Sequence, residues 1–173
     1  GSALLRALQL MQRRGYTKKI GVSIYAPAEL DDILELGVFE LVQAPLNILD
    51  RRLVESGWAQ QLRERGVELH VRSVFLQGLL LMSTEHRPPK FDRWSDIWEE
   101  WARWLKVSGV SPVRACLQYV LSVPEVVRLV VGVDNLEHLQ EILSASAGSL
   151  PDLPEWPTPP EIELINPAYW NQL

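Results

Sequence analysis

Side chains that commonly perform chemistry are few and scattered in this sequence. The single cysteine, Cys116, lies in an apolar helical pattern, which predicts a buried, inert thiol rather than a nucleophile. One cysteine allows no intrachain disulfide and no multi-cysteine metal site. His70 lies in an apolar run typical of a strand and His138 in a polar helical pattern, so we expect a hydrogen-bonded sheet histidine and a solvated one. These residues alone predict no metal centre and no catalytic cluster.

Two further groups lie on a predicted helix at residues 93–106. Asp96, Glu99 and Glu100 form a charged helix face rather than an acid–base pair. Tryptophans recur at i, i+4 and i+7, with an adjoining i, i+3 spacing, at Trp94, Trp98, Trp101 and Trp104. This spacing predicts that the helix packs on the body of the protein. A surface for a partner or a sugar is the alternative.

Composition places the chain among globular proteins. Its 173 residues are 47% hydrophobic and 23% charged, which is enough for one domain with a core. The net charge of −5 and the scattered Lys and Arg residues disfavour a general nucleic-acid surface. The sequence has no apolar run of ~20 residues and no signal-peptide pattern, so we expect a cytoplasmic protein without a membrane partner.

Strand and helix patterns alternate along most of the chain. A helix at 3–15 is followed by strands at 18–24, 39–44, 67–74 and 126–131, and by helices at 27–36, 53–65, 93–106, 112–122 and 136–145. The strands are short and nearly continuously apolar, which is typical of parallel strands buried on both faces. The pattern predicts an α/β fold with four parallel strands and covering helices. Periodicity does not distinguish an open doubly wound sheet from half of a closed barrel.

The C-terminal residues differ in composition. Five prolines between Leu150 and Glu161 predict an extended tail at 150–173, separate from a domain at 1–149. Aromatic residues in the tail suggest that parts of it are anchored on the body: Trp156, Tyr169 and Trp170.

Three segments carry a more specific signal. They are Lys-Ile-Gly-Val-Ser at 19–23, Val-Gln-Ala-Pro-Leu-Asn at 42–47 and Arg-Ser-Val-Phe-Leu-Gln-Gly-Leu-Leu at 72–80. In order and spacing they resemble the fifth, sixth and seventh barrel strands of the aldo-keto reductases. Residues 111–121 are similar to the helix before the eighth strand, and residues 130–139 to the eighth strand with its cofactor helix.

The resemblance covers residues 3–145 and implies half of a (β/α)8 TIM barrel, strands five to eight. The Arg-Ser-X-Phe-Leu-Gln-Gly form of the seventh strand is most similar to the branch associated with bacterial surface-sugar biosynthesis. The family transfers hydride between a nicotinamide cofactor and a carbonyl carbon, and a tyrosine supplies the proton. Its catalytic Asp, Tyr, Lys and His come from the first four strand ends. We therefore carry over no catalytic residue and expect this chain alone to be inactive.

The resemblance implies a cofactor cradle at the strand ends. Ser23 and Gln43 would hydrogen-bond the nicotinamide carboxamide, whereas Ile24 stands where the family usually has an Asn. Ser73 and Gln77 would contact phosphate or substrate. Ordinary strand-end polar groups are the alternative for Ser23, Gln43 and Ser73.

The family's tyrosine that stacks on the nicotinamide is replaced here by Arg72. Its guanidinium could stack, or bind an anionic substrate or the cofactor pyrophosphate. The alternative is a pair with a carboxylate such as Glu40 or Glu68.

The segment similar to the eighth strand has Gly132, Asp134 and Asn135, with His138 where the family often has an Arg. An acidic group near the ribose disfavours a 2′-phosphate, so we expect NAD rather than NADP. Glu141 would approach the adenine, and the helix that begins after Asn135 favours an anion through its dipole.

The resemblance therefore implies a fragment of an NAD(P)-dependent oxidoreductase that acts on a small carbonyl or sugar substrate. The alternative is a non-catalytic half-barrel module that self-associates or is fused to another enzyme. A half-barrel exposes two strand edges and the apolar inner face of its sheet. We therefore expect the partner to be a missing N-terminal half-barrel or a second copy of the chain.

Overall fold

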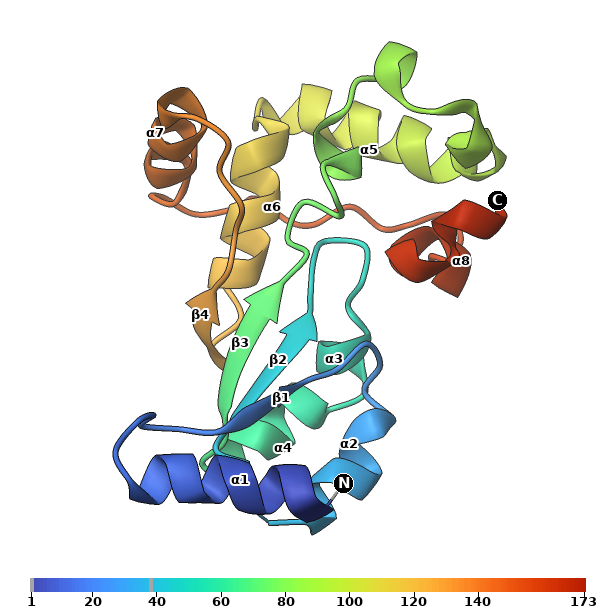
Figure 1. Ribbon diagram of the computed structural model, residues 1–173. Coiled ribbons are helices and arrows are strands. Elements are labelled where there is room, and N and C mark those ends of the chain that lie inside the picture. The colour runs from blue at the N-terminus through green and yellow to red at the C-terminus, as the bar shows by residue number, and fades with distance from the viewer. Residues whose placement is uncertain (1, 38) are drawn as a thin grey trace.

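The computed structural model describes residues 2–37 and 39–173. Four parallel strands form one sheet in the order β1 (Gly21–Ser23), β2 (Leu41–Pro45), β3 (Glu68–Arg72) and β4 (Val126–Leu129) (Figure 1). Strands that are neighbours in the chain are neighbours in the sheet, and helices connect them. This is the predicted α/β class in the form of a partial (β/α) barrel, because strand order follows chain order without a reversal.

Helices precede, connect and follow the strands. Their bounds are α1 (Ser2–Arg13), α2 (Glu29–Glu35), α3 (Arg52–Glu55), α4 (Trp58–Glu64), α5 (Ser95–Ser108), α6 (Pro112–Leu121), α7 (Leu136–Ala145) and α8 (Ile162–Ile165). Short 3-10 helices accompany them in the described ranges, at η1 (Leu79–Leu81), η2 (Thr84–His86), η3 (Pro89–Trp94) and η4 (Pro167–Gln172). The side chain of Ser111 caps α6 and that of Asn135 caps α7, as serine and asparagine commonly do.

One predicted helix is divided in two. The pattern predicted a single helix at 53–65, but α3 ends at Glu55 and α4 begins at Trp58. Gly57, between them, has a φ of 78°, which is left-handed and incompatible with a continuous right-handed helix. The apolar period continues through the break, so periodicity alone did not reveal it.

The two faces of the sheet differ in polarity, which corrects a prediction from the sequence. Along β2 and β3 buried residues alternate with half-buried ones. Val42, Ala44, Leu69 and Val71 join the core beneath the helices. The alternate positions on the opposite, inner face include Gln43, Glu68, His70 and Arg72. The strands are therefore not apolar on both sides, and the expected apolar inner face was wrong.

The Trp-rich helix packs on the body, as its spacing predicted. Trp94, Trp98 and Trp101 are buried, and the indole N–H groups of Trp98 and Trp101 donate to the carbonyl oxygens of Phe91 and Leu80. Trp104 stacks on Trp101 with the ring centroids 5.6 Å apart. Trp98 and Trp101 thus attach α5 to the chain around it, and Trp94 lies in η3 just before the helix.

The C-terminal tail departs from the predicted extended chain. Its proline-rich part is extended, but the chain then forms α8 and η4. Figure 1 shows the tail passing α6 and reaching α8 near η3. Leu164 and Ile165 of α8 belong to the hydrophobic core. Trp156 and Trp170 pack against that core, whereas Tyr169 is 39% exposed. Prolines restrict only their neighbours, so they did not prevent helices after Pro160.

Candidate functional site

A cavity of about 550 Å³ lies at the carboxyl ends of β3 and β4. One wall comes from the loop after β3, another from the chain after β4, and a third from α7. Seven of the ten cradle residues predicted from the sequence line it: Arg72, Ser73, Gln77, Gly132, Asp134, His138 and Glu141. Carboxyl strand ends are where (β/α) barrels place their ligands.

The loop after β3 has an unusual backbone. Ser73, Leu76 and Gln77 have φ angles of 62°, 47° and 54°, in the left-handed region that residues other than glycine seldom occupy. The buried amide of Asn47 donates to the carbonyl oxygen of Ser73 at 3.1 Å, and Leu76 N–H donates to the same oxygen at 2.9 Å. Surrounding contacts therefore hold a backbone that is costly on its own.

Asn47 also orders the loop after β2. Its side-chain oxygen accepts from the backbone N–H groups of Leu49 and Asp50 at 3.0 and 2.9 Å. The residue is fully buried. In the sequence Asn47 ends the segment 42–47, and the pattern predicts no role for it. Only the folded structure shows that one amide joins the loops after β2 and β3.

Arg72 is fixed at the end of β3 without a carboxylate partner among the described residues. Nη2 donates to the carbonyl oxygen of Ile24 at 3.0 Å and Nη1 to Ser73 Oγ at 3.2 Å. The guanidinium carbon lies 4.7 Å from the centroid of the Tyr25 ring. The suggested pairs with Glu40 or Glu68 do not form.

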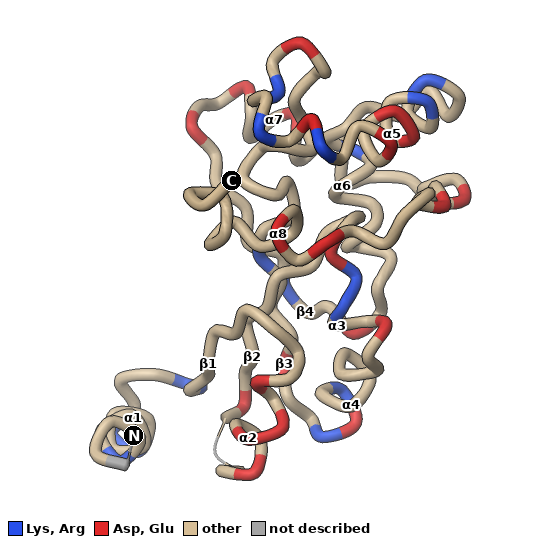
Figure 2. The backbone as a smooth tube through the Cα atoms, turned by 90° about the vertical axis from the view of Figure 1, so that its right-hand side faces the viewer, with Lys and Arg blue, Asp and Glu red and all other residues tan. Residues whose placement is uncertain are grey.

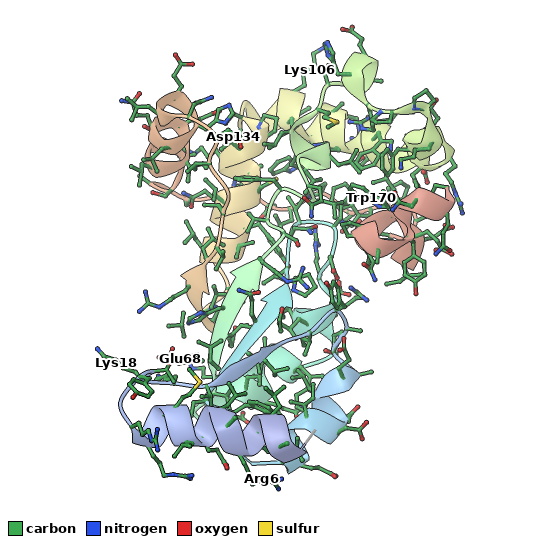
Figure 3. The ribbon with its side chains drawn as sticks, viewed as in Figure 1. Arg6, Lys18, Glu68, Lys106, Asp134 and Trp170 are labelled. Carbon is green, nitrogen blue, oxygen red and sulfur yellow. The ribbon has the colours of Figure 1, made fainter. Side chains whose placement is uncertain are left out.

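Glu68 has other partners at the far end of β3. Its carboxylate pairs with Lys19 at 2.6 Å and lies 3.4 Å from His70 Nε2. The hydrogen bond from Lys19 lowers the pKa of Glu68. Figure 3 shows Glu68 at the opposite end of the molecule from Asp134, so this pair is remote from the cavity.

The wall at α7 carries the acidic groups of the cavity. Asp134 precedes the helix (Figure 3). Its carboxylate lies 3.7 Å from His138 Nδ1. Glu141 follows one turn after His138 on the same side. Asn135 does not line the cavity, because its side chain accepts from His138 N–H at 2.9 Å and caps α7.

Ser23 and Gln43 lie together but outside the residues that line the cavity. They face each other in the register of β1 and β2, and Ser23 Oγ donates to Gln43 Oε1 at 3.2 Å. Both lie on the polar inner face. The structure therefore brings this predicted pair into contact, with Ser23 at the end of β1 and Gln43 in the middle of β2, opposite His70 of β3.

Sequence reasoning missed the apolar lining of the cavity. These residues are Val74, Phe75, Leu81, Val113, Val130, Val131 and Ile142. They come from four separate segments, and in the sequence each resembles an ordinary core residue. The sole available signal was their position just after predicted strands or on the apolar faces of helices.

Other reactive groups lie away from the cavity. Cys116 is fully buried, as predicted, and burial raises the pKa of its thiol. Burial also raises the pKa of the Tyr119 phenol to about 12. Among the described residues, no three His, Cys, Asp or Glu side chains gather into a possible metal site. Nor does any helix in this part of the chain have the length and apolarity needed to cross a membrane.

A family model described as "Aldo/keto reductase family" matches residues 2–153. The chain belongs to the aldo/keto reductase family. The comparison with curated protein sequences gave no match.

Solved aldo-keto reductases have the same fold. The holo form of aldo-keto reductase AKR11C1 from Bacillus halodurans is 23% identical, with a TM-score of 0.66, over 85% of this chain and 51% of that one. The thermostable aldo-keto reductase Tm1743, in complex with the inhibitor epalrestat, is 25% identical, with a TM-score of 0.61, over 86% and 50%. The glycerol dehydrogenase AKR11B4 from Gluconobacter oxydans is 20% identical, with a TM-score of 0.53, over 89% and 56%. This aldo/keto reductase chain thus spans about half the length of these proteins.

Proposed function

We propose that this chain is the C-terminal, cofactor-binding half of an NAD(P)-dependent oxidoreductase, strands five to eight of its barrel. One observation carries the proposal: seven of the predicted cradle residues, far apart in the sequence, surround one cavity at the strand ends. When bound, a nicotinamide cofactor would supply the hydride. The residues of this chain would bind and orient it.

The residues around the cavity suit the two ends of a dinucleotide. Arg72, Ser73 and Gln77 offer N–H and O–H donors on the wall at β3. Asp134 and Glu141 offer acceptors for hydroxyl groups on the wall at α7. The apolar residues that line the cavity suit flat rings. The cavity therefore has the donors, acceptors and apolar surface that a nicotinamide dinucleotide requires.

The acidic wall favours NAD over NADP. A ribose 2′-phosphate near Asp134 would meet a like charge, whereas a free 2′-hydroxyl would donate a hydrogen bond to it. Arg72 is the only Lys or Arg among the residues lining the cavity in the described part of the chain. It belongs to the wall at β3, whereas Asp134 belongs to the wall at α7.

Calorimetric titration with NADH and NADPH tests this proposal. We expect NADH to bind more tightly, and Asp134→Lys to shift the NADPH-to-NADH affinity ratio by about tenfold, the scale of one charge-assisted hydrogen bond. Glu137→Lys is the matched control, because Glu137 is exposed on α7 and does not line the cavity. An equal shift in both variants would show that Asp134 does not determine the preference. If neither nucleotide binds, the result favours a non-catalytic half-barrel module.

A non-catalytic half-barrel module is the second candidate. The replacements at Ile24 and Arg72 favour it, since each removes a cofactor contact that the resemblance implied. If the chain is instead part of an active reductase, we propose a small carbonyl substrate such as a free or nucleotide-linked sugar. This rests on the Arg-Ser-Val-Phe-Leu-Gln-Gly segment at 72–78.

Either function requires a partner at the two edges of the sheet. The helix before β1, α1, exposes Leu4, Leu10 and Met11, and the helix after β4, α7, exposes Leu136 and Leu143. The edges also differ in charge. Residues 1–28 contain five Lys or Arg and no acid, and Figure 2 shows the basic residues on α1. After Arg128 the chain contains seven Asp or Glu and no Lys or Arg.

We propose that the missing N-terminal half-barrel, or a second copy of the chain, covers these edges. Light scattering after size-exclusion chromatography would separate the cases. A dimer that dissociates in high salt supports self-association through the two oppositely charged edges. A monomer at every concentration supports a separate half-barrel.

A further inference from the structure

Arg72 is held at the cavity wall by contacts from three directions. The carbonyl oxygen of Ile24 accepts from Nη2, Ser73 Oγ accepts from Nη1, and the ring of Tyr25 covers one face of the guanidinium. The two hydrogen bonds use two of its five N–H groups. Within the described residues, the structure gives Arg72 no other acceptor and no carboxylate partner. Three donors are thus free at the wall of a cavity.

Tyr25 is itself fixed through its backbone. The carboxylate of Glu29 accepts from the N–H groups of Tyr25 and Ala26, both at 2.7 Å. The carbonyl oxygen of Tyr25 accepts from Arg52 at 3.2 Å. Arg52 is in turn held by the buried Asp50, through hydrogen bonds of 2.7 and 2.8 Å. The backbone that carries the ring is therefore held by hydrogen bonds on both sides, although 57% of the residue is exposed.

A guanidinium fixed in this way loses little conformational entropy when it binds a ligand. Its free donors suit an oxyanion, because a planar fork matches the oxygens of a carboxylate or a phosphate. The acidic groups of the cavity belong to a different wall, at α7, so they do not pair with Arg72. The cavity thus has a cationic wall and an acidic wall.

We infer that Arg72 binds an anionic group of the ligand, a phosphate or a carboxylate, and that Tyr25 is a positioning residue that holds Arg72 for this contact. The inference rests on the proposed function in taking the cavity as the ligand site. The anion has two possible sources, the diphosphate of the cofactor or an anionic substrate.

Inorganic pyrophosphate is the probe for the anion site. Nuclear magnetic resonance would follow the Arg72 Nε–H signal during titration of the whole chain. We expect this signal to shift, and Arg72→Gln to weaken pyrophosphate binding by about tenfold, as expected when a charge-assisted hydrogen bond is lost. Arg128→Gln on β4 is the control, because it removes the same charge from a residue that does not line the cavity.

Substitutions at Tyr25 test the positioning role. Tyr25→Leu should weaken pyrophosphate binding by about threefold, the scale of an exposed cation–π contact, and should broaden or move the Arg72 signal in the free protein. Tyr25→Phe keeps the ring and should restore both. If Tyr25→Leu binds pyrophosphate as tightly as the wild type does, the positioning role is wrong.

Nucleotide titrations identify the source of the anion. If NADH and ADP-ribose displace pyrophosphate, the anion is the cofactor diphosphate. If pyrophosphate still binds to NADH-saturated protein, the anion belongs to the substrate. Pyrophosphate binding at Arg72 without any NADH binding would reject the proposed cofactor function and retain the anion site. The inference would be overturned if pyrophosphate left the Arg72 signal unchanged and bound Arg72→Gln as tightly as the wild type. This holds whether or not NADH binds.

Discussion

The C-terminal segment should be an integral part of the core, and Leu164→Ala tests this. Leu164 is fully buried in α8, within the segment 150–173 that the prolines predicted to be an extended tail. The substitution removes three carbon atoms. At about 0.8 kcal/mol for each buried carbon, the lost transfer free energy is about 2.4 kcal/mol. The cavity left behind raises the expected loss to about 3 kcal/mol of the free energy of unfolding.

Other contacts hold the C-terminal segment in place around this leucine. The indole N–H of Trp94 donates to the carboxylate of Glu161 at 3.2 Å, and that of Trp104 donates to the carbonyl oxygen of Asp152 at 2.8 Å. Because these anchors fix the segment at Asp152 and at Glu161, on both sides of four of its five prolines, the site cannot easily collapse around the missing atoms. The expected loss of stability therefore exceeds the transfer free energy alone.

Urea unfolding followed by tryptophan fluorescence measures the effect. Leu143→Ala is the matched control, because Leu143 is 62% exposed on α7 and its truncation should cost less than about 0.5 kcal/mol. The reasoning fails if Leu164→Ala loses no more than this control. A separate transition at low urea would also refute it, because the segment would then unfold independently of the core.

Three further outcomes follow from individual residues. Cys116 should resist alkylation by iodoacetamide at neutral pH and react after denaturation in guanidinium, because burial raises its pKa and blocks access; rapid labelling of the native chain would contradict this. Glu68→Gln should lower stability at pH 7, because Lys19 lowers the pKa of Glu68 from its ordinary 4.5. This contribution is present above pH 4.5 and is lost as the pH falls through the lowered value, so urea midpoints of variant and wild type should converge in acid. Gly21→Ala should cost about 1–3 kcal/mol in urea unfolding, since an added Cβ would overlap the carbonyl oxygen of Leu41 on β2, whereas Gly132→Ala has open space.

Much of the fold could be predicted because each element carries its own signal. Short apolar runs separated by helical patterns indicated the four parallel strands, whereas their order followed only from the resemblance to half of a barrel. The polarity of the inner face was harder to predict, although Glu68, His70 and Arg72 alternate with apolar residues along β3. The apolar residues of the neighbouring strands obscure this alternation in the sequence. A strand with one polar face then resembles one that is buried on both sides.

The sequence predicted which residues form the site better than it predicted the contacts between them. Motif positions identified most of the polar residues around the cavity, because these lie just after strands. The contacts of Arg72 could not be predicted, since Ile24 lies 48 residues earlier in the chain and follows a strand that is not adjacent to β3. The turn at Gly57 and the helix α8 were missed for a related reason. Both depend on local backbone conformation or on packing, which the spacing of apolar residues does not indicate.

The separation of charge along the chain also affects how it meets a partner. The basic residues of α1 and the acidic residues of α7 lie at opposite ends of the molecule (Figure 1). These two helices should orient a partner of complementary charge before contact, so association should be fastest in dilute salt. The effect should fade as ionic strength rises and the screening length falls to ~10 Å at 0.1 M. The molecule should also bind both cation- and anion-exchange resins, despite its net charge of −5.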